Sequence, residues 1–243
     1  MFTEEGYPSD QQAKAMLVEY GRRMYEHGYV VTNDGNISVK VSPTEIWVTP
    51  TAVSKGFMTP EMMVKMDLDG NILEGERKPS SEVKMHLRVY KENKKVRGVV
   101  HAHPTNATSF AIAGIPLDDP ILVESMLQLG AVPVARYAKP GTYDVPDSIA
   151  PYCKDYNAVL LSNHGALTWG ESLMQAYYRM EVLETYAAME LNVRALNQKR
   201  RLSTEQIAEL QQLRDTLELG SAKMPKGCDA AENLTDIIPQ TNA

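Results

Sequence analysis

Three of the five histidines stand where buried strands are expected to end. His101 and His103 form a His-Ala-His-Pro sequence after the apolar run that ends at Val100, and His164 follows the apolar run 158–161. Side chains at positions i and i+2 of a strand point to the same face, so the imidazoles of His101 and His103 can bind one metal ion. A third imidazole from a neighbouring strand would complete a site that suits Zn²⁺, while Mn²⁺ or Co²⁺ would fit the same ligands.

The spacing of these histidines leaves a structural role open, in which the rings only bond to carbonyls of turns. The other two histidines, His27 and His86, fall within predicted helices. We expect both to be surface or half-buried packing residues without a chemical role.

A second group of polar residues lies at 78–82, where the sequence reads Lys-Pro-Ser-Ser-Glu. Ser80 and Ser81 open a predicted helix, and hydroxyls together with free backbone amides at a helix start can bind phosphate. Glu82 would then lie near that anion as a proton donor or acceptor. The competing interpretation is an ordinary helix cap with an acidic first turn.

Two turns beside predicted strands carry further small polar residues. Asn36 and Ser38 follow an Asp-Gly turn, and Thr51 and Ala52 follow a Thr-Pro turn. Backbone amides in such turns can form an anion-binding concavity, although either turn alone is a common connection between strands.

The elements that must position these residues follow from apolar spacing and turn signals. Capping residues and helical periodicity predict helices at 9–27, 171–196 and 204–219. Another helix opens at 80–82, with Val83, Leu87 and Tyr90 on its apolar side, and Pro104 marks the start of a further one. Strands are predicted at 36–41, 45–49, 63–67, 72–74, 96–101, 132–135 and 158–161, with Asp69-Gly70 as a hairpin turn. Hairpin-paired strands mixed with helices indicate one α/β domain with a mixed or antiparallel sheet.

Composition excludes several classes of protein. The net charge is −6, and a nucleic-acid-binding protein would need a basic stripe, so no nucleic-acid partner is expected. No apolar run approaches the roughly 20 residues of a membrane span, and the acidic start does not resemble a signal peptide. Cys153 and Cys228 lack metal-ligand or redox spacing, so we interpret both as free thiols in a reducing cytoplasm.

The order of these motifs resembles the class II aldolase/adducin family over about residues 10–200. The series is Gly-Asn-Ile-Ser, Thr-Pro-Thr, Lys-Pro-Ser-Ser-Glu, His-Ala-His-Pro and Asn-His-Gly. The resemblance implies a three-layer α/β/α catalytic domain at 1–220 with a largely antiparallel sheet. The segment 221–243 is polar and interrupted by proline and glycine, so we expect it to be a loose tail. The resemblance also implies a homotetramer with fourfold symmetry and active sites at the subunit interfaces.

The same resemblance implies roles for individual residues. The metal ligands would be His101, His103 and His164, with Glu82 as catalytic acid/base and as a fourth ligand in an empty site. The substrate phosphate would bind at Asn36, Thr51, Ala52, Ser80 and Ser81. Two departures stand out. Ala52 occupies a position where the aldolases usually have glycine, and the two tyrosines that the aldolases use are absent: the region of the first reads Leu-Val-Glu-Ser-Met at 122–126, and no tyrosine follows Tyr186. The group that protonates the leaving alkoxide is therefore unidentified, and Glu124 is a speculative substitute.

The function implied is metal-dependent cleavage of a ketose 1-phosphate, similar to L-fuculose 1-phosphate, into dihydroxyacetone phosphate and an aldehyde through a zinc-stabilised enediolate. Pentulose-5-phosphate 4-epimerases and decarboxylases of phosphorylated keto-acids share the scaffold and are the nearest alternatives. Glu82 favours the aldolase over the epimerases, which typically carry aspartate there. A non-catalytic adducin-like assembly module is a remote alternative, because such modules lose the three histidines that this chain keeps.

Overall fold

The computed structural model describes residues 6–228 of the 243-residue chain. Their strands form one eight-stranded sheet in the order β4-β3-β2-β1-β5-β8-β7-β6. Every neighbouring pair is antiparallel except β6 and β7, which are parallel. The prediction of a mixed, largely antiparallel sheet is therefore confirmed. The strands are β1 (Asn36–Lys40), β2 (Glu45–Val48), β3 (Val64–Asp67), β4 (Ile72–Glu74), β5 (Gly98–Ala102), β6 (Val134–Ala135), β7 (Ala158–Leu161) and β8 (Gly165–Gly170).

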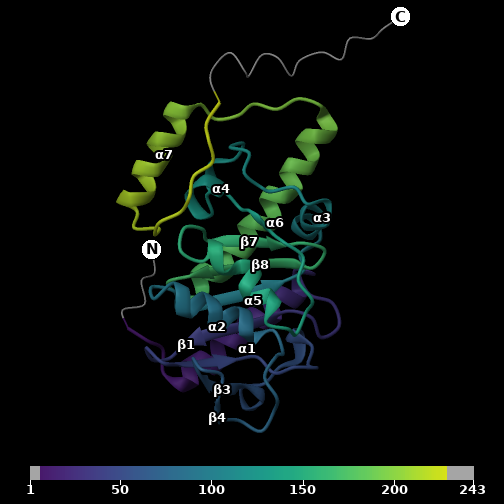
Figure 1. Cartoon of the computed structure of the whole chain (residues 1–243), viewed down its shortest axis with the longest axis vertical. Coiled ribbons are helices and arrows are strands. Elements are labelled where there is room, and N and C mark those ends of the chain that lie inside the picture. Colours follow the sequence, from purple (N-terminus) through teal and green to yellow (C-terminus); the bar gives the residue numbers. More distant parts are fainter. Residues whose placement is uncertain (1–5, 229–243) are drawn as a thin grey trace, which may run out of the picture.

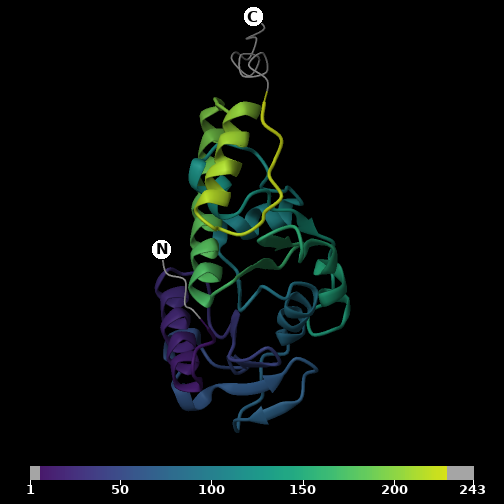
Figure 2. The ribbon, with the colours of Figure 1, turned by 90° about the vertical axis from the view of Figure 1, so that its left-hand side faces the viewer.

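Helices cover both faces of this sheet (Figures 1 and 2), as predicted for a three-layer α/β/α domain. On one face, α1 (Asp10–Glu26), α3 (Thr105–Ala113) and α6 (Leu173–Leu196) pack on a buried apolar cluster. On the other face, α2 (Val83–Glu92) and α5 (Asp144–Ile149) cover a second cluster. Because both faces are covered, the central strands β1, β5, β7 and β8 are buried along their whole length.

The helices α4 (Val123–Gln128) and α7 (Thr204–Thr216) lie together at one end of the molecule (Figure 1). Residues 221–228 return to this end: Lys223 accepts a hydrogen bond from the Ala131 amide at 2.8 Å and donates its own amide to Asp155 at 2.7 Å. The expectation of a loose tail is therefore wrong for 221–228, because backbone hydrogen bonds tie that segment to the domain. Residues 229–243 lie outside the described part.

Local signals located most of the predicted elements. Ser9 caps α1 in a capping box with Gln12, and the Asp69-Gly70 turn joins β3 to β4. Helix α2 starts at Val83 instead of Ser80, because the turn before it is held by the Ser80 hydroxyl, which accepts from the Glu82 amide at 3.3 Å. Strand β8 and helices α4 and α5 were not predicted. Among residues 6–228, no helix has the length and apolar character needed to cross a bilayer.

Candidate metal centre and active site

Sheet register brings the three strand-end histidines to one edge. His101 is the penultimate residue of β5 and lies opposite Asn36 of β1. His103 follows β5 directly, and its amide donates to the Tyr29 carbonyl at 2.9 Å. His164 lies in the tight turn between β7 and β8, where Leu161 pairs with Gly165. The antiparallel order β5-β8-β7 therefore places both His-containing segments side by side.

The three imidazoles converge on one point, with ligand atoms that all lie within 4.8 Å of one another. His101 bonds through Nδ1 to the Ala166 carbonyl at 2.9 Å, so in the neutral ring Nδ1 carries the proton and Nε2 offers a lone pair to a metal ion. The Nε2 atoms of His101 and His103 are only 3.1 Å apart. Two facing lone pairs repel each other unless a cation or a proton lies between them. The donor set therefore fits a divalent cation bound by three imidazoles.

Glycine at 165 is required by the position of the His103 ring. A Cβ atom there would lie 2.4 Å from Cδ2 of His103 and 2.6 Å from the Ala102 carbonyl oxygen. Gly35 is constrained in a similar way, since its φ is +72° and a Cβ would lie 2.9 Å from the His101 carbonyl. The glycines of the Asp-Gly-Asn and Asn-His-Gly sequences thus allow the loops to close around the histidines.

Glu82 faces the histidines from the start of α2. Its Oε1 lies 3.1 Å from Nε2 of His164, and its Oε2 lies 3.4 Å from Nε2 of His101. Burial would raise the pKa of this carboxyl, but the charge of His101 and hydrogen bonds from His101 and His164 outweigh that effect and lower it. Glu82 is therefore ionised at neutral pH and can accept a proton.

Burial and neighbouring charges shift the pKa values of His101 and His103 in opposite directions. Burial, with the charges of His101 and His164, lowers the pKa of His103 to about 3. Burial would also lower the pKa of His101, but the nearby Glu82 carboxylate raises it. A neutral His103 is the form that a metal requires.

His86 is wholly buried, whereas we expected a surface or half-buried residue. Its Nδ1 lies 2.7 Å from the Ser38 hydroxyl and its Nε2 lies 2.6 Å from Oδ1 of Asn36. The prediction failed because α2 packs this side chain against β1, a contact that helical position alone does not reveal. His27 is half exposed, as expected.

The residues expected to bind phosphate lie on two backbone segments that pair with each other. Pro50 and Pro79 form an isolated antiparallel bridge, and the Thr51 amide donates to the Lys78 carbonyl at 3.0 Å. The hydroxyls of Thr51 and Ser81 are at exposed positions beside this bridge. Asn36 differs from them: its side chain is buried, and it donates through Nδ2 to Oε2 of Glu82 at 2.9 Å.

Lys55 was not singled out by the sequence, yet it holds two of these loops. Its ammonium group donates to the carbonyls of Asn33, at 3.1 Å, and Val53, at 2.8 Å. The side chain is buried, and burial lowers its pKa to about 8 despite the charges of Asp34 and Glu82. Its only sequence signal is a lysine close to the Thr-Pro-Thr turn.

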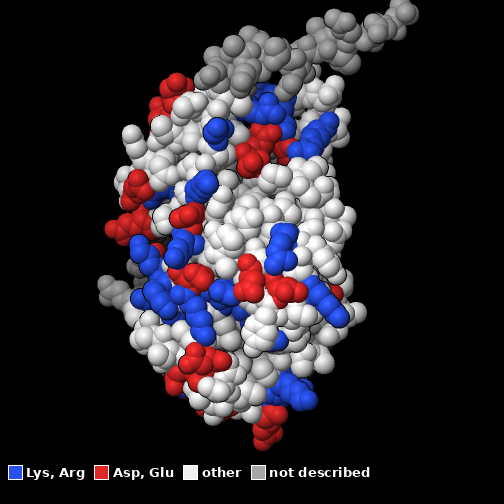
Figure 3. Space-filling view, in the orientation of Figure 1, with Lys and Arg blue, Asp and Glu red and all other residues white. Residues whose placement is uncertain are grey.

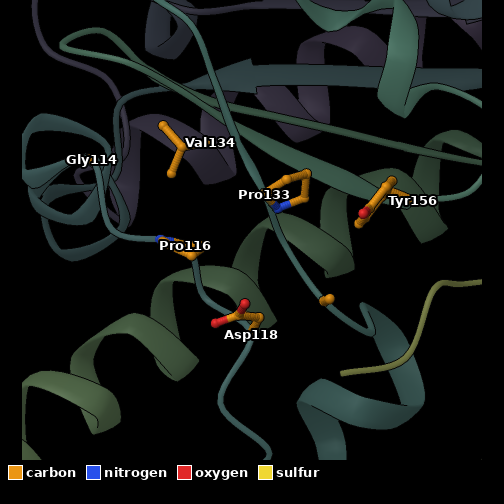
Figure 4. Close-up of a pocket in the computed structure, with 7 residues that line it drawn as sticks. Gly114, Pro116, Asp118, Pro133, Val134 and Tyr156 are labelled. Carbon is orange, nitrogen blue, oxygen red and sulfur yellow. The ribbon is translucent and has the colours of Figure 1, made fainter. Parts of the chain in front are cut away.

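A groove of about 560 Å³ runs along α2 and is lined by Ser80 and Ser81 among others. Its three cations are already engaged: Lys84 with the Gly141 carbonyl, Arg88 with Asp147 and Glu92, and Lys91 with Asp69. Figure 3 accordingly shows positive and negative side chains intermixed on this side of the molecule. A second pocket, of about 340 Å³ (Figure 4), has only Asp118 and Tyr156 as ionisable side chains in its lining and contains no candidate site residue.

The family model described as the class II aldolase and adducin N-terminal domain matches residues 15–191. The chain belongs to the class II aldolase and adducin family. It is 32% identical over 212 residues to 3-oxo-tetronate 4-phosphate decarboxylase of Pectobacterium atrosepticum, covering 86% of this chain and 96% of the relative. It is 33% identical over 173 residues to L-fuculose phosphate aldolase of Methanococcus maripaludis, covering 71% and 93%. A solved structure of L-fuculose 1-phosphate aldolase superposes with a TM-score of 0.77 at 30% identity, covering 89% of this chain and all of that chain.

Two residues depart from the pattern expected of aldolases in this family. Ala52 has a φ of +57°, in the left-handed region where glycine is favoured, so the alanine adopts the conformation of the expected glycine at some cost. Glu124 lies exposed in the first turn of α4. The speculative substitute for the missing tyrosine therefore presents a carboxylate to solvent in the single chain.

Proposed function

We propose that this chain is a metal-dependent carbon–carbon lyase that cleaves a ketose 1-phosphate into dihydroxyacetone phosphate and an aldehyde. The observation that carries the proposal is the position of Glu82, whose two carboxylate oxygens lie 3.1 Å and 3.4 Å from the ring nitrogens of His164 and His101. A base so close to a three-imidazole cluster can act on a substrate held at that cluster.

His101, His103 and His164 would hold the cation, with zinc as the first choice and manganese or cobalt as substitutes. When bound there, a divalent cation supplies Lewis-acid stabilisation of the negative charge that develops on substrate oxygens. Glu82 lies within reach as a further ligand while no substrate is present.

Glu82 would move the proton at carbon. In condensation the ionised carboxylate removes a proton from that carbon. In cleavage the substrate hydroxyl beside the breaking bond loses its proton as the aldehyde forms, and Glu82, once it has taken up a proton, gives it to the carbon that has lost its bond. Its carboxylate is kept ionised, because the lowered pKa favours the charged form. Its position beside the histidines aims it at whichever carbon the substrate presents there.

The phosphate would bind at the paired segments that carry Thr51, Ala52, Ser80 and Ser81, as hydroxyls and backbone amides. Of the cations that line the groove along α2, Arg88 and Lys91 pair with carboxylates, while Lys84 bonds only to the Gly141 carbonyl, so neutral donors would share the recognition with Lys84. Asn36 was also assigned to this pocket. Its buried bond to Glu82 supports a position at the inner end of the pocket, beside the reacting carbon.

Decarboxylation of a phosphorylated 3-keto acid is the second candidate reaction. It is favoured by Glu124, because loss of carbon dioxide leaves no alkoxide that needs a phenol as proton donor. Relatives named as 3-oxo-tetronate 4-phosphate decarboxylase also support it. In either reaction Glu82 would protonate the carbon.

A homotetramer with sites at the subunit interfaces belongs to the same proposal. The exposed positions of Thr51 and Ser81 leave that side of the site open to a neighbouring chain. Light scattering should then give a particle about four times the 27.1 kDa chain, and a fully active monomer would contradict the assembly.

The deciding experiment offers the metal-loaded protein two panels of substrates. Ketose 1-phosphates are followed by coupled detection of dihydroxyacetone phosphate, and phosphorylated 3-keto acids by release of carbon dioxide. Turnover in one panel assigns the reaction. If the fully loaded tetramer turned over neither panel, the lyase proposal would be wrong.

A further inference from the structure

Four hydrogen bonds connect a buried tyrosine to Glu82. They join the Tyr90 hydroxyl to Ser38 (2.8 Å), Ser38 to Nδ1 of His86 (2.7 Å), Nε2 of His86 to Oδ1 of Asn36 (2.6 Å) and Nδ2 of Asn36 to Oε2 of Glu82 (2.9 Å). Asn36 and Ser38 are on β1, and the other three residues start and line α2. Tyr90, Ser38, His86 and Asn36, the four residues that these hydrogen bonds connect to Glu82, are all buried.

The direction of every bond in the chain follows from the orientation of the Asn36 side chain. Its amide nitrogen faces Oε2 of Glu82 and its oxygen faces Nε2 of His86, and an amide oxygen only accepts. His86 must then carry its proton on Nε2, which leaves Nδ1 as an acceptor. Ser38 therefore donates to Nδ1 of His86 and accepts from Tyr90. Each donor in this arrangement meets one acceptor.

The opposite direction would require the Asn36 amide to be reversed from the orientation that the structure has. If His86 carried its proton on Nδ1, Asn36 would have to turn its amide nitrogen toward His86. Its oxygen would then face Oε2 of Glu82, and two acceptors would be in contact at 2.9 Å. In a site shielded from water this contact is costly unless Glu82 is protonated. The tautomer of His86 and the group that Asn36 presents to Glu82 are thus linked through one amide.

We infer that Ser38, His86 and Asn36 are positioning residues that hold Glu82 as an oriented carboxylate. The inference rests on the proposed function, in which Glu82 moves a proton. Asn36 gives Oε2 a fixed donor at 2.9 Å, while Oε1 faces Nε2 of His164 at 3.1 Å, so the plane of the carboxylate is set from both sides. Ser38 acts three hydrogen bonds away from Glu82, because it fixes the tautomer of His86 and so the orientation of Asn36.

The first test is the tautomer of His86 in the metal-free protein, read from ¹⁵N NMR of labelled histidine. The ring signals that disappear in His86→Gln belong to this residue. We expect them to show a neutral ring with the proton on Nε2 at pH 7. A proton on Nδ1, or a doubly protonated ring, would overturn the inference, and this readout requires no activity.

The second test compares Ser38→Ala with Ser38→Thr, which restores the hydroxyl, in the metal-loaded protein. We expect Ser38→Ala to lower kcat roughly 10–100-fold with little change in KM or in bound metal, and Ser38→Thr to recover most of that loss. Thr168→Val is the matched control, because it removes a buried strand hydroxyl that bonds to Ala176 on the other face of the sheet. An equal loss in Thr168→Val and Ser38→Ala, or an unchanged kcat in Ser38→Ala, would overturn the inference.

The two proposals fail in different ways. A metal-loaded wild type that turns over neither substrate panel contradicts the lyase function. In that case the tautomer of His86 still decides whether the hydrogen bonds from Tyr90 to Glu82 run in the direction described. An active wild type with the wrong tautomer contradicts only the positioning role. If Ser38→Thr did not fold, the tautomer measurement on the wild type would decide alone.

Discussion

Pro50 and Pro79 pair in an antiparallel bridge, although neither belongs to a regular strand. A hydrogen bond supports the bridge on each side. The Thr51 amide donates to the Lys78 carbonyl at 3.0 Å, and the Ser80 amide donates to the Thr49 carbonyl at 3.2 Å. Two polar turns about thirty positions apart in sequence are thereby held together. This contact makes them candidates for a single phosphate-binding pocket.

Ser81→Ala should therefore weaken binding of a phosphorylated substrate. A lost hydrogen bond to a charged group costs about 1.5–3 kcal/mol, so KM should rise at least 10-fold with a smaller effect on kcat. Inorganic phosphate should compete with substrate in the wild type and less in the variant. Ser109→Ala, whose hydroxyl bonds within α3, is the control. Equal turnover of phosphorylated and unphosphorylated substrates by the wild type would refute the pocket.

Ala52→Gly should not destabilise the protein, unlike most replacements of alanine by glycine. The left-handed φ of +57° costs an alanine about 1–2 kcal/mol, and the extra freedom of glycine in the unfolded chain costs about 0.4–1 kcal/mol. Urea unfolding should then show a gain of roughly 0–1 kcal/mol. Ala15→Gly, at an exposed position inside α1, should lose about 1 kcal/mol. A comparable loss at Ala52 would show that its conformation is not strained.

Lys55 should make stability rise with pH above neutrality. Burial lowers its folded pKa to about 8 from an ordinary 10.5, so between these values the unfolded chain binds more protons than the folded one. The free energy of unfolding of the wild type, relative to Lys55→Met, should grow by about 3 kcal/mol from pH 7.5 to 10.5. Urea titrations across that range measure it, with exposed Lys154→Met as the control. A constant difference between wild type and Lys55→Met would contradict the buried charge.

The fold was largely predictable because many of its elements carry local signals. The Ser9 cap and the Asp69-Gly70 turn act on their immediate neighbours, and the structure has both. Strand β8 lacks such a signal: its six residues begin and end with glycine, and it is extended because β5 and β7 pair with it on both sides. The position of β8 between β5 and β7 in the sheet, rather than a local sequence signal, makes this segment a strand.

Some residues of the candidate site were likewise predictable from local sequence, and others depend on how the chain packs. The strand-end positions of His101 and His103 follow from an apolar run and a proline, and the structure brings their rings together. His86 was missed because its role depends on which strand α2 covers. A signal does exist in hindsight: Glu82, His86 and Tyr90 recur every four residues, so they share one face of α2, and that face meets alternate residues of β1.

Metal binding is tested by His103→Ala. We expect the wild type, purified without chelator, to carry about one zinc per chain, and the variant to carry almost none, because two imidazoles and a carboxylate make a weaker site. A chelator should lower the Tm of the wild type and leave that of the variant unchanged, since a ligand that binds only the folded state stabilises it. His27→Ala serves as the control on an exposed histidine. A fully active, metal-free preparation would refute the metal site.

Glu82→Gln tests the proton transfer itself. The amide keeps the shape of the side chain, and its oxygen can still accept from Asn36, but it cannot take up the substrate proton. The three histidines should still bind zinc, while turnover should fall roughly 10²–10⁴-fold, the usual share of a general base. Glu209→Gln, at an exposed position of α7, should change neither property.

Hydrogen exchange separates a lost base from a distorted site. If the chain is an aldolase, the wild type should exchange one hydroxymethyl hydrogen of dihydroxyacetone phosphate with solvent deuterium in the absence of any aldehyde, because removal of that proton is the first step of condensation. Glu82→Gln should bind dihydroxyacetone phosphate with a similar Kd and yet lose the exchange by the same factor as turnover. Exchange at the wild-type rate in a zinc-loaded variant would show that another group moves the proton. Glu82, held at 2.9 Å from the Asn36 amide, would then be only a residue at the start of a helix.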